Sequence, residues 1–279
     1  YDYLTYGTQQ WTVENAAMET YRDGTPIPQV TDATQWSNLT TGAWCYYDND
    51  PTKGKLYNWY AVAGIHDEAS LTDPSLRKEI TPEGWHIPTP TDFETLSDYL
   101  ISEGYIFDNG TTVFSSAKSV ASTTGWDVSA NNEAVGNDQS LNNSSGLNIF
   151  PTGQRGDTGL GFYGEGQNAQ LWTSTENVQF DFGYYKQLFY YNSIWCCSTP
   201  GVYSYKYFGK SLRMTKNSTT ASLNDLNFSK LNIFPNPVGD TFEINADHIE
   251  NLSIYNILGE KVFHTQNQRI IDVSSLASG

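Results

Sequence analysis

The chain has 279 residues, 38% of them hydrophobic, so it is long enough to form one large domain or two ordinary ones around an apolar core. Its 31 acidic and 15 basic side chains give a formal net charge of -16, which argues against DNA, RNA or anionic membranes as partners. No run approaches the roughly 20 apolar residues of a transmembrane helix and no leader is recognisable at Tyr1, so we expect any export leader to have been removed already.

Aromatic and turn-forming residues are frequent along the chain. There are 8 Trp, 19 Tyr, 13 Phe and 23 Gly, together with many Asn, Ser and Thr. This composition is typical of folded proteins rich in turns and irregular segments. We therefore expect short strands and long loops to dominate.

The first segment with metal-binding character is Asp48-Asn49-Asp50. Its side-chain oxygens are ligands that calcium prefers, but the spacing and the closing Glu of an EF-hand are absent. Asp and Asn ahead of Pro51 are equally what a tight turn requires, because their side chains bond to nearby backbone amides. We expect a structural turn and no cofactor, with Ca2+ as the alternative.

No complete catalytic pattern is present. His66 and His86 have no HExxH motif and no second histidine at helical spacing. Ser174, close to Glu176, lacks both a G-x-S-x-G elbow and a neighbouring histidine. We expect structural roles for these residues and favour a protein that is not an enzyme.

Two helices are expected in the middle of the chain. The longer covers residues 92–102, with Thr91 as its N-cap and Glu94 completing a capping box. Three apolar side chains would share its buried face: Phe93, Leu96 and Leu100. A shorter helix would cover 115–121, and most of 125–166 is expected to be loop, a kind of segment that often carries function.

The three cysteines are too few for a disulfide scaffold. Cys196 and Cys197 are adjacent and would form a strained vicinal disulfide if they paired with each other. Alternatively, one of them pairs with Cys45 and leaves a free thiol. Both pairings remain open.

A change of composition marks a domain boundary. All Trp and all Cys precede the polar segment KNSTTASLNDLNFSK, residues 216–230, which cannot bury enough apolar surface to offset its ordering entropy. We place the break near Ser218, with a domain over 1–216, a linker over 217–230 and a second domain over 231–279.

Five short segments with alternating or β-branched character predict a small β-sandwich at the C-terminal end. They are residues 231–234, 241–245, 252–255, 261–264 and 269–273. Pro235-Asn236-Pro237 ends the first strand because its prolines lack amide donors, and Gly259 lies in a hairpin turn.

This C-terminal part resembles the type A sorting domain of the type IX secretion system through its blocks FPNPVGD, SIYNILGEKV and IDVSSLASG. The resemblance implies an Ig-like β-sandwich with a sorting signal that includes Pro235, Asn236, Pro237 and Gly259. It also implies a cargo that the translocon of Bacteroidota and its outer-membrane carrier deliver to the cell surface or the extracellular space. Family members usually continue with an aromatic residue and two more strands, so we expect an incomplete domain at Gly279.

Seven blocks in the larger part carry a second resemblance. They are GTQQWTVEN, GAWCYYDND, GKLYNWYAV, PEGWHIPT, FPTGQR, LWTSTE and KSLRM. In this order they resemble the Fibrobacter succinogenes major paralogous domain, an extracellular module related to the C-type-lectin-like and formylglycine-generating-enzyme-like folds. The resemblance implies a loop-rich α+β domain with few helices. Thr81 and Met214 stand where relatives often have Cys, so a family disulfide is expected to be missing or rewired.

Four tryptophans in these blocks are candidate ligand-binding residues: Trp44, Trp59, Trp85 and Trp172. An exposed indole would stack on a sugar face at little entropic cost. The alternative is that most of them fill the core of a loop-rich domain, where aromatic side chains dominate burial.

Together, these features predict a secreted or cell-surface cargo whose large domain is a non-catalytic module for adhesion or binding. The expected ligand is a polysaccharide or another surface component, held by exposed aromatic residues and the loop over 125–166. The alternative is an extracellular enzyme acting on polymers or thiols, with carboxylates such as Glu83, Glu165 and Glu176 in its site.

Overall fold

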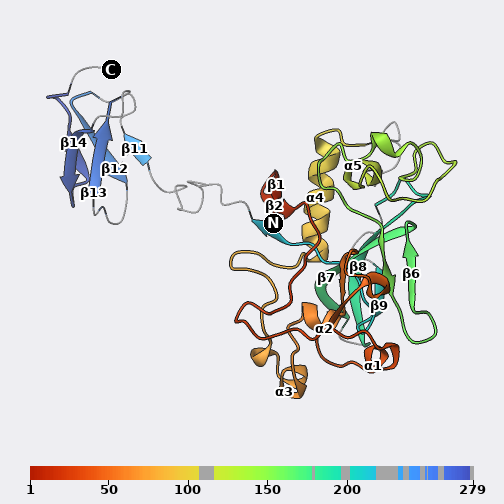
Figure 1. Cartoon of the computed structure of the whole chain (residues 1–279). Coiled ribbons are helices and arrows are strands. Elements are labelled where there is room, and N and C mark those ends of the chain that lie inside the picture. Colours follow the sequence, from red (N-terminus) through yellow and green to blue (C-terminus); the bar gives the residue numbers. More distant parts are fainter. Residues whose placement is uncertain are drawn as a thin grey trace. The chain divides into compact units, whose positions relative to one another are not determined.

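The computed structural model describes residues 1–106, 116–177, 180–195, 202–217, 232–234, 239–245, 249, 251–256 and 261–276. The chain divides into two compact units, Tyr1–Ser218 and Thr219–Gly279. Figure 1 shows both units, the first in red to teal and the second in blue. Each unit has its own strands and its own apolar core.

A five-stranded sheet is the largest element of the first unit. Its strand order is β6 (Phe162–Glu165), β5 (Thr152–Arg155), β7 (Asn168–Asn177), β8 (Phe182–Phe189) and β9 (Val202–Tyr205). Neighbouring strands are antiparallel except β5 and β7, which run parallel. The β8–β9 hairpin therefore forms one edge of this sheet.

The beginning and end of the first unit pair in a second sheet. It contains β1 (Tyr3–Tyr6), β2 (Gln9–Thr12) and β10 (Thr215–Asn217), with β2 in the centre. Strands β3 (Trp44–Tyr46) and β4 (Lys55–Tyr57) form a separate antiparallel hairpin. Long-range pairing thus holds together segments that lie some 200 residues apart in the sequence.

The helices are short and begin at polar caps. The described residues contain five α-helices: α1 (Ala33–Ser37), α2 (Trp59–Val62), α3 (Glu68–Thr72), α4 (Pro90–Ser102) and α5 (Ala117–Val120). Single 3-10 turns cover Tyr47–Asn49, Pro74–Leu76 and Gln139–Leu141. Asp32, Asn58, Asp67 and Thr89 each accept a hydrogen bond from the backbone N–H three residues later, which satisfies a donor that the first helical turn leaves unpaired.

Helix α4 begins earlier than expected. Its N-cap is Thr89 rather than Thr91, and the capping box is closed by Asp92 rather than Glu94. Pro90 occupies the first helical turn, where its missing N–H costs nothing. The predicted buried face is confirmed, because Phe93, Leu96 and Leu100 are at most 1% exposed.

The segment over 125–166 contains more regular structure than expected. Strands β5 and β6 both lie in it, together with one 3-10 turn, so only its first part is an irregular loop. The helix expected over 115–121 is reduced to α5 in the described part of that range.

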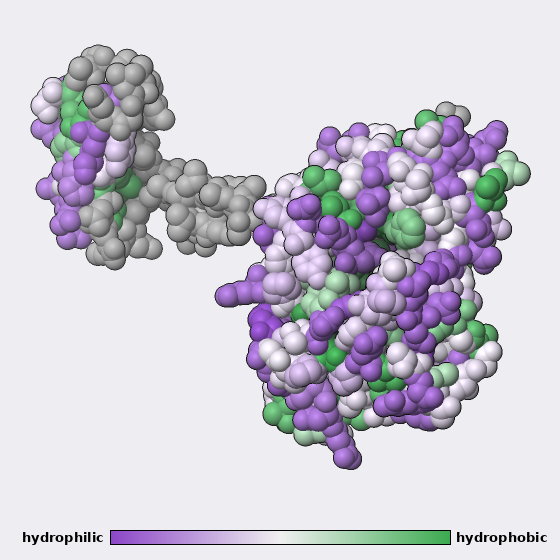
Figure 2. All heavy atoms as spheres, viewed as in Figure 1, coloured by the Kyte–Doolittle hydropathy of each residue, from purple (hydrophilic) through white to green (hydrophobic). Residues whose placement is uncertain are grey.

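Tryptophan fills much of the core of the first unit. Five indoles are less than 2% exposed: Trp11, Trp36, Trp59, Trp172 and Trp195. They belong to three clusters, around α4, around α2 and β7, and around β3. The face of the molecule in Figure 2 is mainly hydrophilic, with hydrophobic residues in small separate areas. Short strands and irregular segments with few helices confirm the predicted loop-rich α+β class.

The second unit is built from strands. A sheet of β11 (Asn232–Phe234), β12 (Thr241–Asn245) and β15 (Ile270–Asp272) accompanies a hairpin of β13 (Asn251–Tyr255) and β14 (Lys261–Gln266). Its core comprises Phe242, Ile244 and Ile271, against which apolar residues of β13 and β14 pack. All five strands expected from the sequence are present, and their ends differ from the expected ones by at most two residues.

Candidate functional site

An aromatic cluster covers one face of the β8–β9 hairpin. Side chains alternate between the two faces of a strand, and the register pairs Phe182 with Tyr205 and Tyr184 with Tyr203. Ring centroids lie 5.0 Å apart for Phe182 and Tyr203, and 4.8 Å apart for Phe182 and Tyr205. Phe180 and Tyr207 extend the cluster at 5.8 Å from Phe182 and 5.3 Å from Tyr205. We call these six residues the aromatic patch.

The opposite face of the hairpin packs on the core. A Cβ atom at Gly183 would lie 2.3 Å from Cδ1 of Trp59, so only glycine allows the strand to approach this indole. The ring of Tyr185 makes an edge contact with Trp172 at 5.9 Å. Because the residues between those of the patch face inward, the patch itself faces away from the core.

The aromatic patch is partly open to solvent. Phe180 is 55% exposed, Tyr203 56% and Tyr205 48%, and the other three rings are half-buried. The hydroxyl of Tyr184 accepts a hydrogen bond from the Asn177 side-chain amide at 3.4 Å. Clustered exposed aromatic side chains on a folded protein typically mark a binding surface.

Three of the four candidate tryptophans are core residues. Trp44, Trp59 and Trp172 are 5%, 1% and 0% exposed and belong to one apolar cluster. Each indole N–H donates to a backbone carbonyl, which holds the ring in place. A buried ring has no face to offer a sugar, so the expectation that these three bind a ligand is corrected in favour of the core role.

Trp85 is the fourth candidate, and it is half-buried. Its ring lies 5.6 Å from Tyr3 in an edge contact, and Nζ of Lys216 lies 4.5 Å from its centroid. These contacts join the PEGWH block to β1 and β10. A ligand-binding role for Trp85 stays a prediction.

Alternating aromatic residues are the sequence signal that points to the patch. Phe180, Phe182 and Tyr184 occupy every second position, as do Tyr203, Tyr205 and Tyr207. On a strand this spacing places the side chains on one face. The tryptophan-rich blocks are the more conspicuous feature of the sequence, but their indoles are mostly buried.

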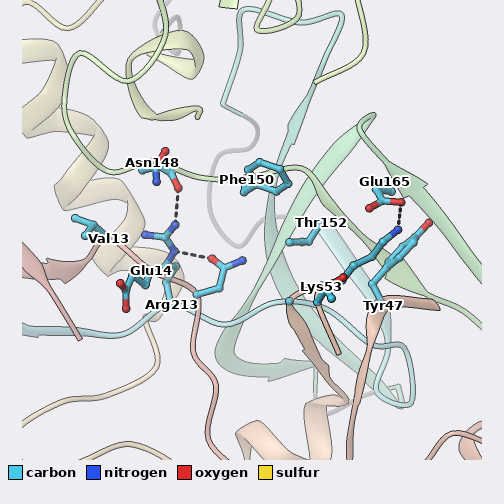
Figure 3. A pocket seen from close by; sticks show the side chains of 12 residues that line it. Val13, Glu14, Tyr47, Lys53, Asn148, Phe150, Thr152, Glu165 and Arg213 are labelled. Carbon is cyan, nitrogen blue, oxygen red and sulfur yellow. Dashed lines mark hydrogen bonds and ion pairs between the residues drawn. The ribbon is translucent and has the colours of Figure 1, made fainter. Parts of the chain in front are cut away.

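A pocket of about 350 Å³ opens elsewhere on the first unit. It is lined by Val13, Glu14, Asn15, Tyr47, Thr52, Lys53, Gly54, Asn148, Phe150, Thr152, Glu165 and Arg213. These residues come from the segment after β2, the turn between β3 and β4, the approach to β5, the end of β6 and the segment before β10. Figure 3 shows Phe150 between two polar groups of side chains.

One end of the pocket holds an ion pair. Nζ of Lys53 lies 2.6 Å from Oε2 of Glu165 and 5.0 Å from the ring centroid of Tyr47. Hydrogen bonding to Glu165 raises the pKa of Lys53. Burial raises the pKa of Tyr47, so its hydroxyl remains protonated at neutral pH.

The other end is formed by Arg213, which is 2% exposed. Its guanidinium donates to the carbonyls of Thr12, Leu147 and Asn148 at 2.7–2.8 Å, and to Oδ1 of Asn15 at 2.7 Å. Burial lowers its pKa to about 9, which leaves it charged at neutral pH. Within the described part of the chain it forms no ion pair, so neutral acceptors fix the orientation of this charge.

The acidic turn is organised by its own backbone. Asp48 and Asn49 have φ angles of 54° and 57°, in the left-handed region that Asp and Asn tolerate best. Oδ1 of Asp50 accepts from the N–H and the hydroxyl of Thr52 at 2.9 and 2.7 Å. The turn interpretation accounts for these side chains, and calcium there stays a prediction.

The candidate proton-transfer and metal residues have local partners. His66 lies 3.3 Å from Asp67, and His86 lies 3.2 Å from Asp92, which closes the capping box of α4. Glu176 pairs with Lys206 at 3.0 Å. Across the described ranges, no three His, Cys, Asp or Glu residues gather in a way that would hold a metal ion.

Cys45 is a free cysteine that is completely buried. Burial raises the pKa of its thiol to about 11, although Arg155 beside it lowers the value in part. Cys196 and Cys197 lie outside the described residues, so their pairing with each other stays a prediction.

The expected sorting signal also falls outside the described residues. This applies to Pro235, Asn236, Pro237 and Gly259, whereas the strands on either side of them are described. Among the described residues, no helix combines the length and the apolar character that crossing a bilayer requires.

Comparison with protein families assigns both parts of the chain. Residues 4–216 match the Fibrobacter succinogenes major domain, and residues 232–279 match the secretion system C-terminal sorting domain. No curated protein and no solved structure matches the chain. The sorting domain indicates export by the type IX secretion system to the cell surface or the extracellular space. The chain therefore belongs to the Fibrobacter succinogenes major domain family and carries a C-terminal sorting domain of the type IX secretion system.

Proposed function

We propose that the first unit is a non-catalytic binding module that attaches the exported protein to a glycan. The observation that carries this proposal is the aromatic patch, in which three rings are about half exposed on the edge hairpin of the sheet. Burying these rings against a ligand would recover the free energy that their exposure to water costs.

The chemistry of the patch favours a carbohydrate. Four of its six residues are tyrosines, which combine an apolar ring with a hydroxyl that donates and accepts hydrogen bonds. Sugar rings have the matching character, with apolar C–H faces and hydroxyl edges. The net charge of -16 disfavours nucleic acids and other polyanions, so an uncharged polysaccharide is the favoured ligand class.

The finer architecture belongs to this proposal. A C-type-lectin-like arrangement of the first unit is supported by its short helices, long irregular segments and the pairing of its first strands with its last one. An Ig-like sandwich in the second unit is supported by two small sheets that share one apolar core. The sorting domain would engage the translocon of Bacteroidota and its outer-membrane carrier during export.

Retention on immobilised polysaccharides tests the proposal. The purified full chain is passed over a panel of uncharged insoluble polysaccharides, and the variant Tyr203→Ala/Tyr205→Ala is compared with the wild type. Removing two exposed rings is expected to weaken retention about tenfold on any matrix that binds, since each stacking contact contributes roughly 0.5–1.5 kcal/mol.

Tyr255→Ala is the matched control, because Tyr255 is 58% exposed but lies in the second unit. It should leave retention unchanged. Failure of the wild type to bind any polysaccharide, or equal losses in both variants, would overturn the proposal. Retention of the wild type by a surface protein and by no polysaccharide would favour a protein partner instead.

A further inference from the structure

We propose that the pocket around Phe150 and Arg213 is a second binding site, which takes a single uncharged sugar residue at the end of a glycan. The inference rests on the proposed glycan-binding function and assigns to the pocket a ligand that differs in size from that of the aromatic patch. At about 350 Å³, the pocket is near the lower end of the roughly 300–1,000 Å³ range for small-molecule sites.

Phe150 supplies the apolar contact. It is 43% exposed, lines the pocket and lies between its two polar ends (Figure 3). Its ring also packs against the backbone of Gly125, where an added Cβ atom would come within 2.4 Å of Cζ. Because this contact supports one part of the ring, Phe150 is held in position to stack on the C–H face of a sugar.

Polar groups suited to sugar hydroxyls lie at the Arg213 end of the pocket. The Glu14 carboxylate is exposed and forms no hydrogen bond or ion pair with the described part of the chain. The side-chain oxygen of Asn15 accepts from Arg213, while its amide N–H₂ group has no partner among the described residues. A neighbouring carboxylate and amide match the acceptor and donor pattern of two adjacent hydroxyls.

Arg213 and Lys53 are held in fixed positions by their partners, and their positive charges are balanced by carboxylates that line the pocket. Arg213 is fixed by four acceptors, and Lys53 is paired with Glu165 at 2.6 Å. The formal charges of Glu14, Glu165, Lys53 and Arg213 cancel. With neutral local charge in a chain of net charge -16, an uncharged sugar is favoured over a uronic acid.

Titration of the full chain with methyl glycosides of neutral hexoses tests the site, with ligand-observed NMR or calorimetry as readout. We expect at least one neutral glycoside to bind the wild type with a millimolar dissociation constant. Phe150→Ala should weaken this binding about fivefold, as expected for one lost stacking contact, and Phe150→Trp should preserve it. Glu14→Gln should also weaken it, because a neutral amide accepts hydrogen bonds less strongly than a carboxylate.

Glu103→Gln is the matched control, since Glu103 is an exposed glutamate outside the pocket. It should bind like the wild type, and thermal melts of all variants would show that they are folded. Absence of binding by every neutral glycoside, preference for glucuronate, or affinities unchanged by Phe150→Ala and Glu14→Gln would each overturn the proposal.

The experiments distinguish failure of the pocket proposal from failure of the proposal for the aromatic patch. Glycoside binding lost in Tyr203→Ala/Tyr205→Ala but kept in Phe150→Ala would overturn the pocket and leave the patch intact. Glycoside binding that depends on Phe150, without retention on any polysaccharide, would support the pocket and overturn the patch.

Discussion

Lys210 is enclosed in the core of the first unit, at 0% exposure. Its Nζ donates to Oε1 of Gln154 at 2.5 Å and to Oε1 of Gln170, and lies 4.1 Å from the ring centroid of Tyr185. Burial lowers its pKa well below the usual value. Because the unfolded chain then binds the proton more tightly, this group makes the protein more stable as the pH rises from the folded-state pKa towards about 10.4.

Lys210→Met is expected to destabilise the first unit. It would leave two buried amide oxygens without their donor, and each such group costs about 1–3 kcal/mol, so a loss of about 2–6 kcal/mol is expected in urea unfolding. Replacing Gln154 and Gln170 by Leu in the same chain should recover much of the loss, because no acceptor is then unpaired. A Lys210→Met variant as stable as the wild type would contradict this account.

At the scale of single residues, the sequence patterns indicate which aromatic residues matter to the first unit, but they do not indicate whether their side chains are buried or exposed. Trp59 and Trp172 lie in family blocks whose sequence fits a ligand-binding role or a core role, and the structure shows that both side chains are buried. Their burial depends on strands that approach from distant segments, such as Gly183 against Trp59. The alternation of aromatic residues within β8 and β9 is a local signal that places their side chains on one face, and the structure shows that this face is partly exposed.

At the scale of elements, the start of α4 shows how local chemistry selects one of two competing signals. Thr89 with Asp92 and Thr91 with Glu94 both have capping-box spacing. The structure uses the first, with hydrogen bonds to Asp92 from the backbone N–H and the hydroxyl of Thr89 at 2.8 and 2.7 Å. Pro90 favours this register because it suits the first helical turn.

Asp92→Asn should reveal the contribution of this cap through pH. Burial raises the pKa of Asp92, but hydrogen bonds from His86 and Thr89 outweigh it and the net pKa is lowered. A lowered folded-state pKa stabilises the fold above about pH 4 and the benefit is lost as the pH falls further. The variant should be about 1–2 kcal/mol less stable at neutral pH and converge with the wild type in acid, as chemical unfolding would measure.

If the free energies of unfolding of the wild type and Asp92→Asn differ by the same amount from neutral to acidic pH, the charge of the Asp92 carboxylate does not contribute to the cap. His86→Ala is a useful comparison, because it removes the side-chain donor to Asp92 and keeps the Thr89 hydrogen bonds.

Strands whose stability comes from distant partners were the hardest elements to predict. The sequences of β5 and β6, TGQR and FYGE, lack clear alternation of polar and apolar residues. The N–H of Arg155 in β5 donates to the carbonyl of Gly209, which lies 54 positions further along the chain. In the second unit, by contrast, short segments with alternating or β-branched residues predict all five strands that the structure contains.

At the scale of the whole molecule, the chain consists of two compact units, and the sorting domain lies in the second. The boundary after Ser218 lies in the polar segment where the composition changes. The cores of the first unit contain residues from Tyr6 to Met214, and the core of the second contains Phe242, Ile244 and Ile271. Among the described residues, each core is made of residues of one unit, so each unit is expected to fold by itself.

Because the two units have separate cores, we expect that export can be abolished without unfolding the first unit. A chain that lacks residues 231–279, expressed with an inner-membrane leader in a bacterium with a type IX system, should remain inside the outer membrane. Immunoblots of the medium and cell surface would measure this loss, and the retained fragment should still resist proteolysis. Undiminished secretion would contradict the sorting role of the second unit, whereas a degraded fragment would contradict the independence of the first.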